Sequence, residues 1–287
     1  MPFDALRDMF GFGSRLLVSG VLNQIFDNIY LMVIGKLFSA ADLGFFTRAK
    51  TLNDLPAQTL SGIVSRVTFP VFSSIQDDPV RIKKGLQKAL TMLVLVNFPM
   101  MIGLAVAARP LVLVLLTEKW APCIPYLQLL CLAGLLYPLH LMNLNVLQAL
   151  GRSDLFLRLE IIKKALIVIN IVVTYRWGIA AMIYGMIITS LLSYYFNSYY
   201  NGVLINYPIK EQVNDLLPYL IMSLLTGTVA YSAGMVLSNN WILLSVQVGI
   251  SGILYIFLCR AFRLKAFMEM WHAMWKRLPL PSEGMAR

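Results

Sequence analysis

The stretch Phe12–Lys50, FGSRLLVSGVLNQIFDNIYLMVIGKLFSAADLGFFTRAK, decides how the rest of the sequence is interpreted. Its first part is long and apolar enough for a membrane-spanning helix, which needs about 20 apolar residues. A short glycine-containing turn and the start of the next helix follow. Asn23, Asp27 and Asn28 lie inside this span, and Asn23 and Asp27 share one helix face. Because polar groups at bilayer depth are expensive and usually face a cavity or a partner helix, this face predicts a polar interior.

The composition places the whole chain in a membrane. Hydrophobic residues make up 59% of the 287 residues and charged residues only 13%, whereas about a quarter of a soluble domain is charged. We therefore expect an all-α, polytopic membrane helix bundle. The net charge of +10 fits the basic cytoplasmic loops of membrane proteins. Outside the spans, no patch of interleaved aromatic and basic residues indicates a nucleic-acid partner.

Hydropathy predicts about eight spans, with Pro125 and Pro138 kinking the fourth and an amphipathic or re-entrant connection over 109–122. The first six spans form one predicted lobe (1–200), followed by two additional helices (201–259) and a cytoplasmic amphipathic tail (260–287). The predicted spans are 16–38, 56–75, 89–108, 123–149, 160–175, 179–199, 216–237 and 241–259.

The distribution of basic residues predicts the orientation. With a cytoplasmic N-terminus, the inner segments hold 17 Lys and Arg residues and the outer segments hold 6. This bias predicts that both termini are cytoplasmic and that the loops 76–88 and 150–164 lie on the same side. The outer basic residues Lys36, Arg48 and Arg109 are candidates for a gate or a cationic mouth on the outer side.

Arg66 and His140 are the remaining candidates for a binding cavity, beside Asn23, Asp27 and Asn28. Arg66 lies near the middle of the second span, where it either pairs with Asp27 or presents its guanidinium to an anionic head group. His140 lies in the fourth span, either as a hydrogen-bonded packing residue or as a titrating group in a wet cavity.

Other polar motifs favour structural roles. Asp77 and Asp78 resemble the paired acids of a metal-dependent glycosyltransferase, but Asp78 followed by Pro79 is better explained as a helix N-cap. The three cysteines lie in apolar stretches without metal-ligand spacing and are expected to pack in the core. The sequence shows no catalytic triad or nucleotide-binding motif, so we predict neither an enzyme nor a metal or cofactor site.

Several stretches resemble the lipopolysaccharide and exopolysaccharide flippases of the multidrug, oligosaccharidyl-lipid and polysaccharide export superfamily, with the colanic-acid type of exporter as the nearest likeness. The resemblance covers about residues 10–200. It is carried by FGSRLLVSG, NIYLMVIGKLFSAADLGFFTRA, Leu55-Pro56, VTFPVFSSIQDD and LNVLQALGRSDLFLRLEIIKK.

The resemblance implies two six-helix lobes around a central cationic cavity, often with two more helices, in the bacterial inner membrane. It implies translocation of an undecaprenyl-pyrophosphate-linked oligosaccharide without any cofactor and with coupling to an H⁺ or Na⁺ gradient. Family members hold about fourteen spans, so the eight predicted here match the C-terminal lobe, with a separate first lobe or a second copy as partner. The alternatives are half of a multidrug or cation exporter, a non-transporting truncated protein, or a membrane enzyme of polysaccharide assembly.

Overall fold

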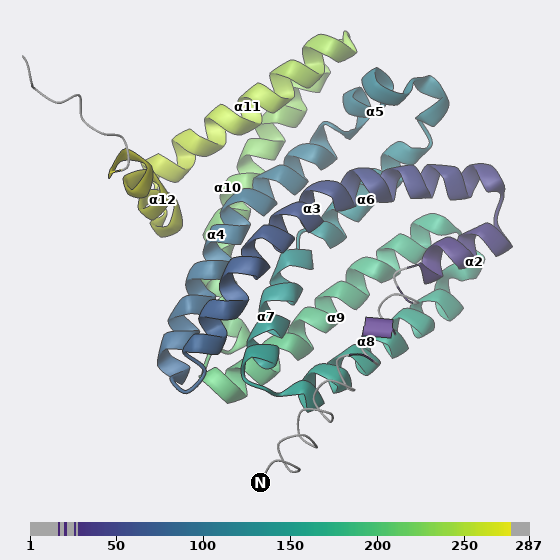
Figure 1. The fold of residues 1–287 in the computed structure, drawn as a ribbon. Coiled ribbons are helices and arrows are strands. Elements are labelled where there is room, and N and C mark those ends of the chain that lie inside the picture. Colours follow the sequence, from purple (N-terminus) through teal and green to yellow (C-terminus); the bar gives the residue numbers. More distant parts are fainter. Residues whose placement is uncertain (1–16, 18–19, 22–25, 27, 277–287) are drawn as a thin grey trace, which may run out of the picture.

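The computed structural model describes residues 17, 20–21, 26 and 28–276, with the side chains of 274–276 left aside. Over these residues the chain is a helix bundle without strands (Figure 1). Its elements are α2 (Ile29–Leu37), α3 (Ala40–Ser74), α4 (Pro79–Val106), α5 (Ala108–Leu116), η1 (Glu118–Trp120), α6 (Cys123–Gly134), α7 (Tyr137–Ala149), α8 (Ser153–Thr174), η2 (Tyr175–Trp177), α9 (Ile179–Ile205), α10 (Ile209–Ser232), η3 (Ala233–Met235), α11 (Asn240–Ala261) and α12 (Lys265–Lys276).

Local sequence signals set the helix boundaries. Ser39 and Asp42 form a reciprocal capping box at the start of α3. The predicted N-cap is confirmed at α4, because the Asp78 carboxylate accepts from the backbone N–H groups of Val80 and Arg81. Asn239 caps α11 in the same way, so the predicted break between the last two spans is confirmed.

Five segments of the described chain are long and apolar enough to span a membrane, and they match five of the eight predicted spans. The helices α3 and α8 have the required length but are not among these five, and both carry several charged residues. Most of the predicted span 16–38 lies outside the described residues. The five segments are Pro79–Val106, Cys123–Ala149, Ile179–Ile205, Ile209–Met235 and Asn240–Ala261.

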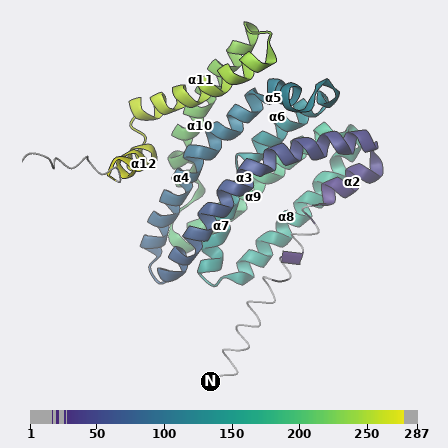
Figure 2. The same cartoon turned by 45° about the horizontal axis from the view of Figure 1, so that its top comes forward.

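Three predicted connections are helical instead. Arg48 lies inside α3, since the capping box starts this helix well before the apolar run that hydropathy detects. The predicted loops 76–88 and 150–164 contain the first turns of α4 and α8. The turns that precede these two helices lie at the same end of the bundle (Figures 1 and 2).

The predicted fourth span is broken into α6 and α7, with Pro138 in the first turn of α7. Proline removes a backbone donor and leaves carbonyl groups without partners. The buried Asn97 amide of α4 lies at the break, donating to Leu135 O at 3.1 Å and approaching Gly134 O at 3.4 Å. A neighbouring helix therefore satisfies part of the backbone that the break exposes.

Two hydrophobic clusters hold the bundle together. One joins α4, α7 and α9 with the last three helices, through residues such as Leu90, Met142 and Tyr219. The other joins α2, α3, α6 and α9, through residues such as Ile34, Phe46 and Leu130. The cysteines at 123, 131 and 259 are buried and unpaired by disulfides, as expected from the sequence.

Candidate functional site

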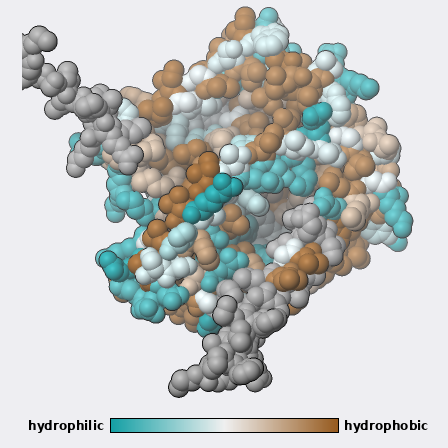
Figure 3. Space-filling view, viewed as in Figure 1, coloured by the Kyte–Doolittle hydropathy of each residue, from teal (hydrophilic) through white to brown (hydrophobic). Residues whose placement is uncertain are grey.

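A cavity of about 650 Å³ lies inside the bundle, within the range of pockets that hold small ligands. The helices α3 and α8 provide two walls, and both pack against α7. In the space-filling view, hydrophilic residues follow α3 across the centre of one face and apolar residues cover much of the rest (Figure 3). The described lining residues are Phe26, Tyr30, Lys50, Asn53, Asp54, Ala57, Gln58, Leu130, Ala133, Gly134, Tyr137, His140, Leu141, Leu144, Asn145, Gln148, Phe156, Glu160, Lys163, Lys164, Ile167, Met186, Thr189, Ser190 and Ser193.

The α8 wall carries a buried charge cluster. Glu160 is only 4% exposed. Its carboxylate lies 2.6 Å from Lys163 Nζ and 3.5 Å from Lys164 Nζ. Lys164 Nζ also lies 5.5 Å from the ring centroid of Phe26. Because these charges occupy positions i, i+3 and i+4, a single helical turn brings two cations and one anion to the cavity.

The α3 wall carries a second, electrically balanced pair. Lys50 binds Asp54 one turn further along the helix, and Asn53 Nδ2 donates to the same carboxylate at 3.0 Å. Asn53 is buried, and its Oδ1 has no partner among the described residues. A Cβ added to Gly134 would lie 2.6 Å from this oxygen, so a larger residue where α6 approaches α3 would displace the Asn53 side chain.

The predicted cavity residue His140 does line the cavity. Asn197 Nδ2 lies 3.2 Å from His140 Nδ1, and Ser190 Oγ lies 2.9 Å from His140 Nε2. Both imidazole nitrogens therefore have partners from α9, and the Tyr194 ring packs edge-on against the imidazole. This cage holds the ring orientation, and of the two roles considered for His140 it favours hydrogen-bonded packing.

The other predicted site residues are dispersed. Asn23 and Asp27 lie outside the described residues, and Asn28 precedes α2 as its N-cap residue. Arg66 is exposed and does not line the cavity. Its neighbour Ser65 instead accepts from Asn145 of α7, and successive residues of a helix point about 100° apart. Arg66 therefore lies outside this cavity, and its predicted contact with an anionic head group stays a prediction.

The predicted cationic mouth is not one cluster. Arg48 lies over the Trp120 ring at 5.2 Å from its centroid and lines a smaller hollow of about 440 Å³. Lys36 and Arg109 are exposed on α2 and α5 and line neither cavity.

Sequence reasoning missed the five charged lining residues. Lys163 and Lys164 counted as loop residues, and Lys50 and Asp54 as a connection. The spacing of Glu160, Lys163 and Lys164 was the available signal, since residues three and four apart share a helix face. Without Lys50, Lys163 and Lys164, the basic residues divide fifteen to five between the predicted inner and outer segments. The orientation bias therefore remains.

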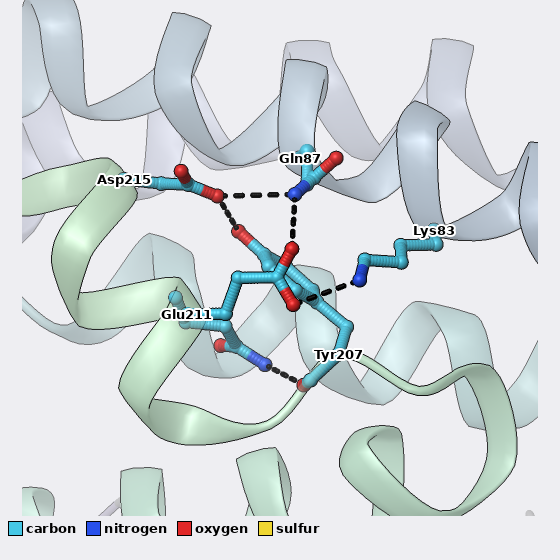
Figure 4. A network of polar contacts seen from close by, with 6 residues as sticks. Lys83, Gln87, Tyr207, Glu211 and Asp215 are labelled. Carbon is cyan, nitrogen blue, oxygen red and sulfur yellow. Dashed lines mark hydrogen bonds and ion pairs between the residues drawn. The ribbon is translucent and has the colours of Figure 1, made fainter.

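A second polar network lies outside the cavity and joins α4 to α10 (Figure 4). Lys83 Nζ lies 2.7 Å from the Glu211 carboxylate, and Gln87 Nε2 donates to both Glu211 and Asp215. The Tyr207 hydroxyl donates to Asp215 at 2.8 Å. Burial, together with this contact to Asp215, raises the pKa of Tyr207 above its ordinary value, so the phenol remains a donor.

Fold and site together define a helical bundle with several membrane-spanning segments and a polar, lysine-bearing cavity. The fold is similar to that of the lipid II flippase MurJ in its inward closed conformation, with a TM-score of 0.71 over 91% of this chain and 53% of that chain. The two sequences are 16% identical, so this likeness concerns the fold.

The sequence comparisons are more specific. A family described as "Polysaccharide biosynthesis protein" matches residues 1–125. The lipopolysaccharide biosynthesis protein WzxC of Escherichia coli (strain K12) is 29% identical over 80% of this chain and 47% of its own length. The teichuronic acid biosynthesis protein TuaB of Bacillus subtilis (strain 168) is 34% identical over 52% of this chain and 31% of its own. The resemblance seen in the sequence is confirmed, and the chain spans about half or less of these curated relatives.

Proposed function

We propose that this chain is part of a membrane flippase that translocates an undecaprenyl-pyrophosphate-linked oligosaccharide. The lysine-bearing cavity within an apolar bundle carries this proposal. Lys163 and Lys164 suit the phosphate groups, since lysine binds phosphate as a point charge. Asn145, Gln148 and Ser190 supply hydrogen-bonding groups for sugar hydroxyls. Such a substrate needs both kinds of contact in one cavity.

The proposed transporter contains a second lobe. This chain matches 47% of the length of WzxC and 53% of the MurJ chain, and we assign it to the C-terminal lobe with two additional helices. The other lobe comes from a first-lobe partner or from a second copy. Arg66, exposed on α3, and Asp27 remain proposed contacts of the head group in that complete transporter.

The proposed location is the bacterial inner membrane, with both termini in the cytoplasm. The excess of basic residues on the predicted inner segments supports this orientation. Transport would be coupled to an H⁺ or Na⁺ gradient, and the protein would act as a transporter rather than an enzyme. Reporter fusions to the α3–α4 and α7–α8 turns test the orientation, and an external position for either turn contradicts it.

Export in a flippase-null bacterium tests the function. We expect the chain to fail alone and to reduce the accumulated lipid-linked oligosaccharide when it is expressed with a matching first lobe. Replacing both Lys163 and Lys164 by Gln should abolish this effect at normal protein abundance. The control, Lys84→Gln with Lys210→Gln, removes two exposed lysines outside the cavity and should export normally. Equal export by both double variants would contradict the proposed role of the cavity.

A multidrug or cation exporter half is the second candidate, because Glu160 and Asp54 could bind a cation beside the aromatic lining residues. The lysine variants separate the two functions. Loss of positive charge should weaken anion transport but strengthen the binding of a cationic drug. Drug resistance conferred by the two-lobe complex, without polysaccharide export, would favour this second function.

A further inference from the structure

The charge cluster of α8 has an unusual arrangement for a buried group of ions. Both Glu160 contacts are made to lysines of the same helix, so the cluster does not join α8 to any other helix through these ion pairs. Taking charges out of water is costly, and the attraction between the charges repays this cost only when the geometry is good and further hydrogen bonds are made. Apart from the contact of Lys164 with the Phe26 ring, the ion pairs of this cluster join no helices among the described residues.

The cluster is also incompletely neutralised. Glu160 directly contacts Lys163 at 2.6 Å, while Lys164 lies 3.5 Å from its other oxygen, beyond a short charge-assisted bond. On the opposite wall, Lys50 is matched by Asp54. Among the described lining residues, the unmatched positive charge therefore belongs to the Lys163–Lys164 pair.

We propose that the Glu160 carboxylate is a built-in competitor for the anionic head group of the substrate. In the empty cavity it holds the two lysines, and a pyrophosphate displaces it and takes over both contacts. A pyrophosphate carries more negative charge and more acceptor oxygens than one carboxylate, so it can engage both ammonium groups directly. Glu160 would thus limit the affinity for the head group and favour its release. This inference rests on the proposed function and specifies the group that controls binding.

Equilibrium binding to the full chain in nanodiscs of neutral phosphatidylcholine tests the proposal. The probes are farnesyl pyrophosphate, inorganic pyrophosphate and uncharged farnesol. We expect Glu160→Gln to lower the Kd of farnesyl pyrophosphate about three- to tenfold, because the competing charge is removed while the side-chain size is kept. Lys163→Gln with Lys164→Gln should raise the Kd more than tenfold. If inorganic pyrophosphate binds and its Kd changes in the same way among the variants, the site is one for free pyrophosphate. If only farnesyl pyrophosphate binds, the site is one for a lipid.

Asp154→Asn is the matched control. Asp154 lies on the same helix but is exposed and outside the cavity lining, so its loss should leave the Kd within about twofold. Equal tightening by this variant would show a general field effect and overturn the proposal. Unchanged or weaker binding by Glu160→Gln would also overturn it. If Glu160→Gln does not fold, Glu160→Asp replaces it, and the retracted carboxylate should give tightening of about twofold or more; no tightening overturns the proposal.

The binding and export experiments fail independently. Tighter binding by Glu160→Gln in a two-lobe complex that exports nothing supports the competitor role and contradicts the transport function. Export that depends on the lysines, combined with a Kd insensitive to Glu160, supports the transport function and contradicts the competitor role.

Discussion

The cavity cluster and the α4–α10 network use the same kinds of residue in opposite ways. In the cavity, Glu160 pairs only with lysines of its own helix turn. In the network, Glu211 of α10 contacts Lys83 and Gln87 of α4. The first arrangement leaves the charges facing an open cavity, whereas the second closes a contact between two helices. Sequence spacing reveals the first type of cluster, and only the fold reveals the second.

The α4–α10 network continues into the interior through Gln212. This side chain is fully buried, and its Oε1 accepts from Asn143, Tyr194 and Ser198. Its amide nitrogen donates to the backbone carbonyl of Tyr207. One residue therefore satisfies four polar groups from α7, α9 and the α9–α10 connection, which makes it the most connected point of the network.

Gln212→Ala should have the largest effect on stability. It leaves three buried donors without their acceptor, and unsatisfied buried groups are costly. Since hydrogen bonds in membrane proteins average about 0.6 kcal/mol, we expect a loss of about 2 kcal/mol or more in the free energy of unfolding, measured by thermal or steric-trapping unfolding in micelles.

Gln148→Ala is the control for this prediction. Gln148 lines the cavity wall, and its side chain makes no hydrogen bond to another described residue. Its truncation should therefore change the free energy of unfolding little. A similar loss for both variants would remove the distinction between network and cavity.

Lys83→Met and Lys163→Met should separate stability from function. Lys83 joins two helices and is partly exposed, so its loss should cost about 0.5–1 kcal/mol in unfolding free energy and leave head-group binding unchanged. Lys163→Met should retain the fold, since Lys164 remains near Glu160, but should weaken binding of farnesyl pyrophosphate. Weaker head-group binding by Lys83→Met, together with a loss of stability in Lys163→Met, would contradict the comparison between the network and the cavity cluster.

The sequence predicted the helical bundle, the Asp78 N-cap and the cavity position of His140, because these follow from hydropathy and local spacing. It did not predict α3 as one long helix, since Lys50 and Asp54 interrupt the apolar pattern that identifies a span. It placed Arg66 in the cavity from its depth alone. Depth fixes how far a residue lies along a helix, but its direction depends on which face packs, and here Ser65 contacts α7.

His140→Ala should have an intermediate effect. It removes the partner of Ser190 and of Asn197 and leaves a gap against Tyr194, so we expect a loss of about 1–2 kcal/mol in unfolding free energy. Ser190→Ala breaks only the contact at Nε2 and should cost about 0.6 kcal/mol. A double-mutant cycle should give a coupling of similar size, and a coupling near zero would show that the 2.9 Å contact does not contribute.

Asp154→Asn should have the smallest effect, and its pH dependence identifies the cause. Arg152 Nε and Nη2 each donate to the Asp154 carboxylate at 3.1 Å, and these bonds hold the pKa of Asp154 below its ordinary value. A carboxylate with a lowered folded-state pKa contributes stability above its unfolded pKa of about 3.9, and this contribution is lost as the pH falls through the folded-state value.

Both side chains are largely exposed, so the contribution at neutral pH should stay within a few tenths of a kcal/mol. We therefore expect the wild type and Asp154→Asn to differ slightly at pH 7 and to converge as the pH falls through the lowered folded-state pKa of Asp154, in paired unfolding measurements at low salt. A difference that persists at acid pH would mean that the carboxylate charge is not its source, and a difference as large as that of Gln212→Ala would contradict the view that ion pairs within one helix add little to this fold.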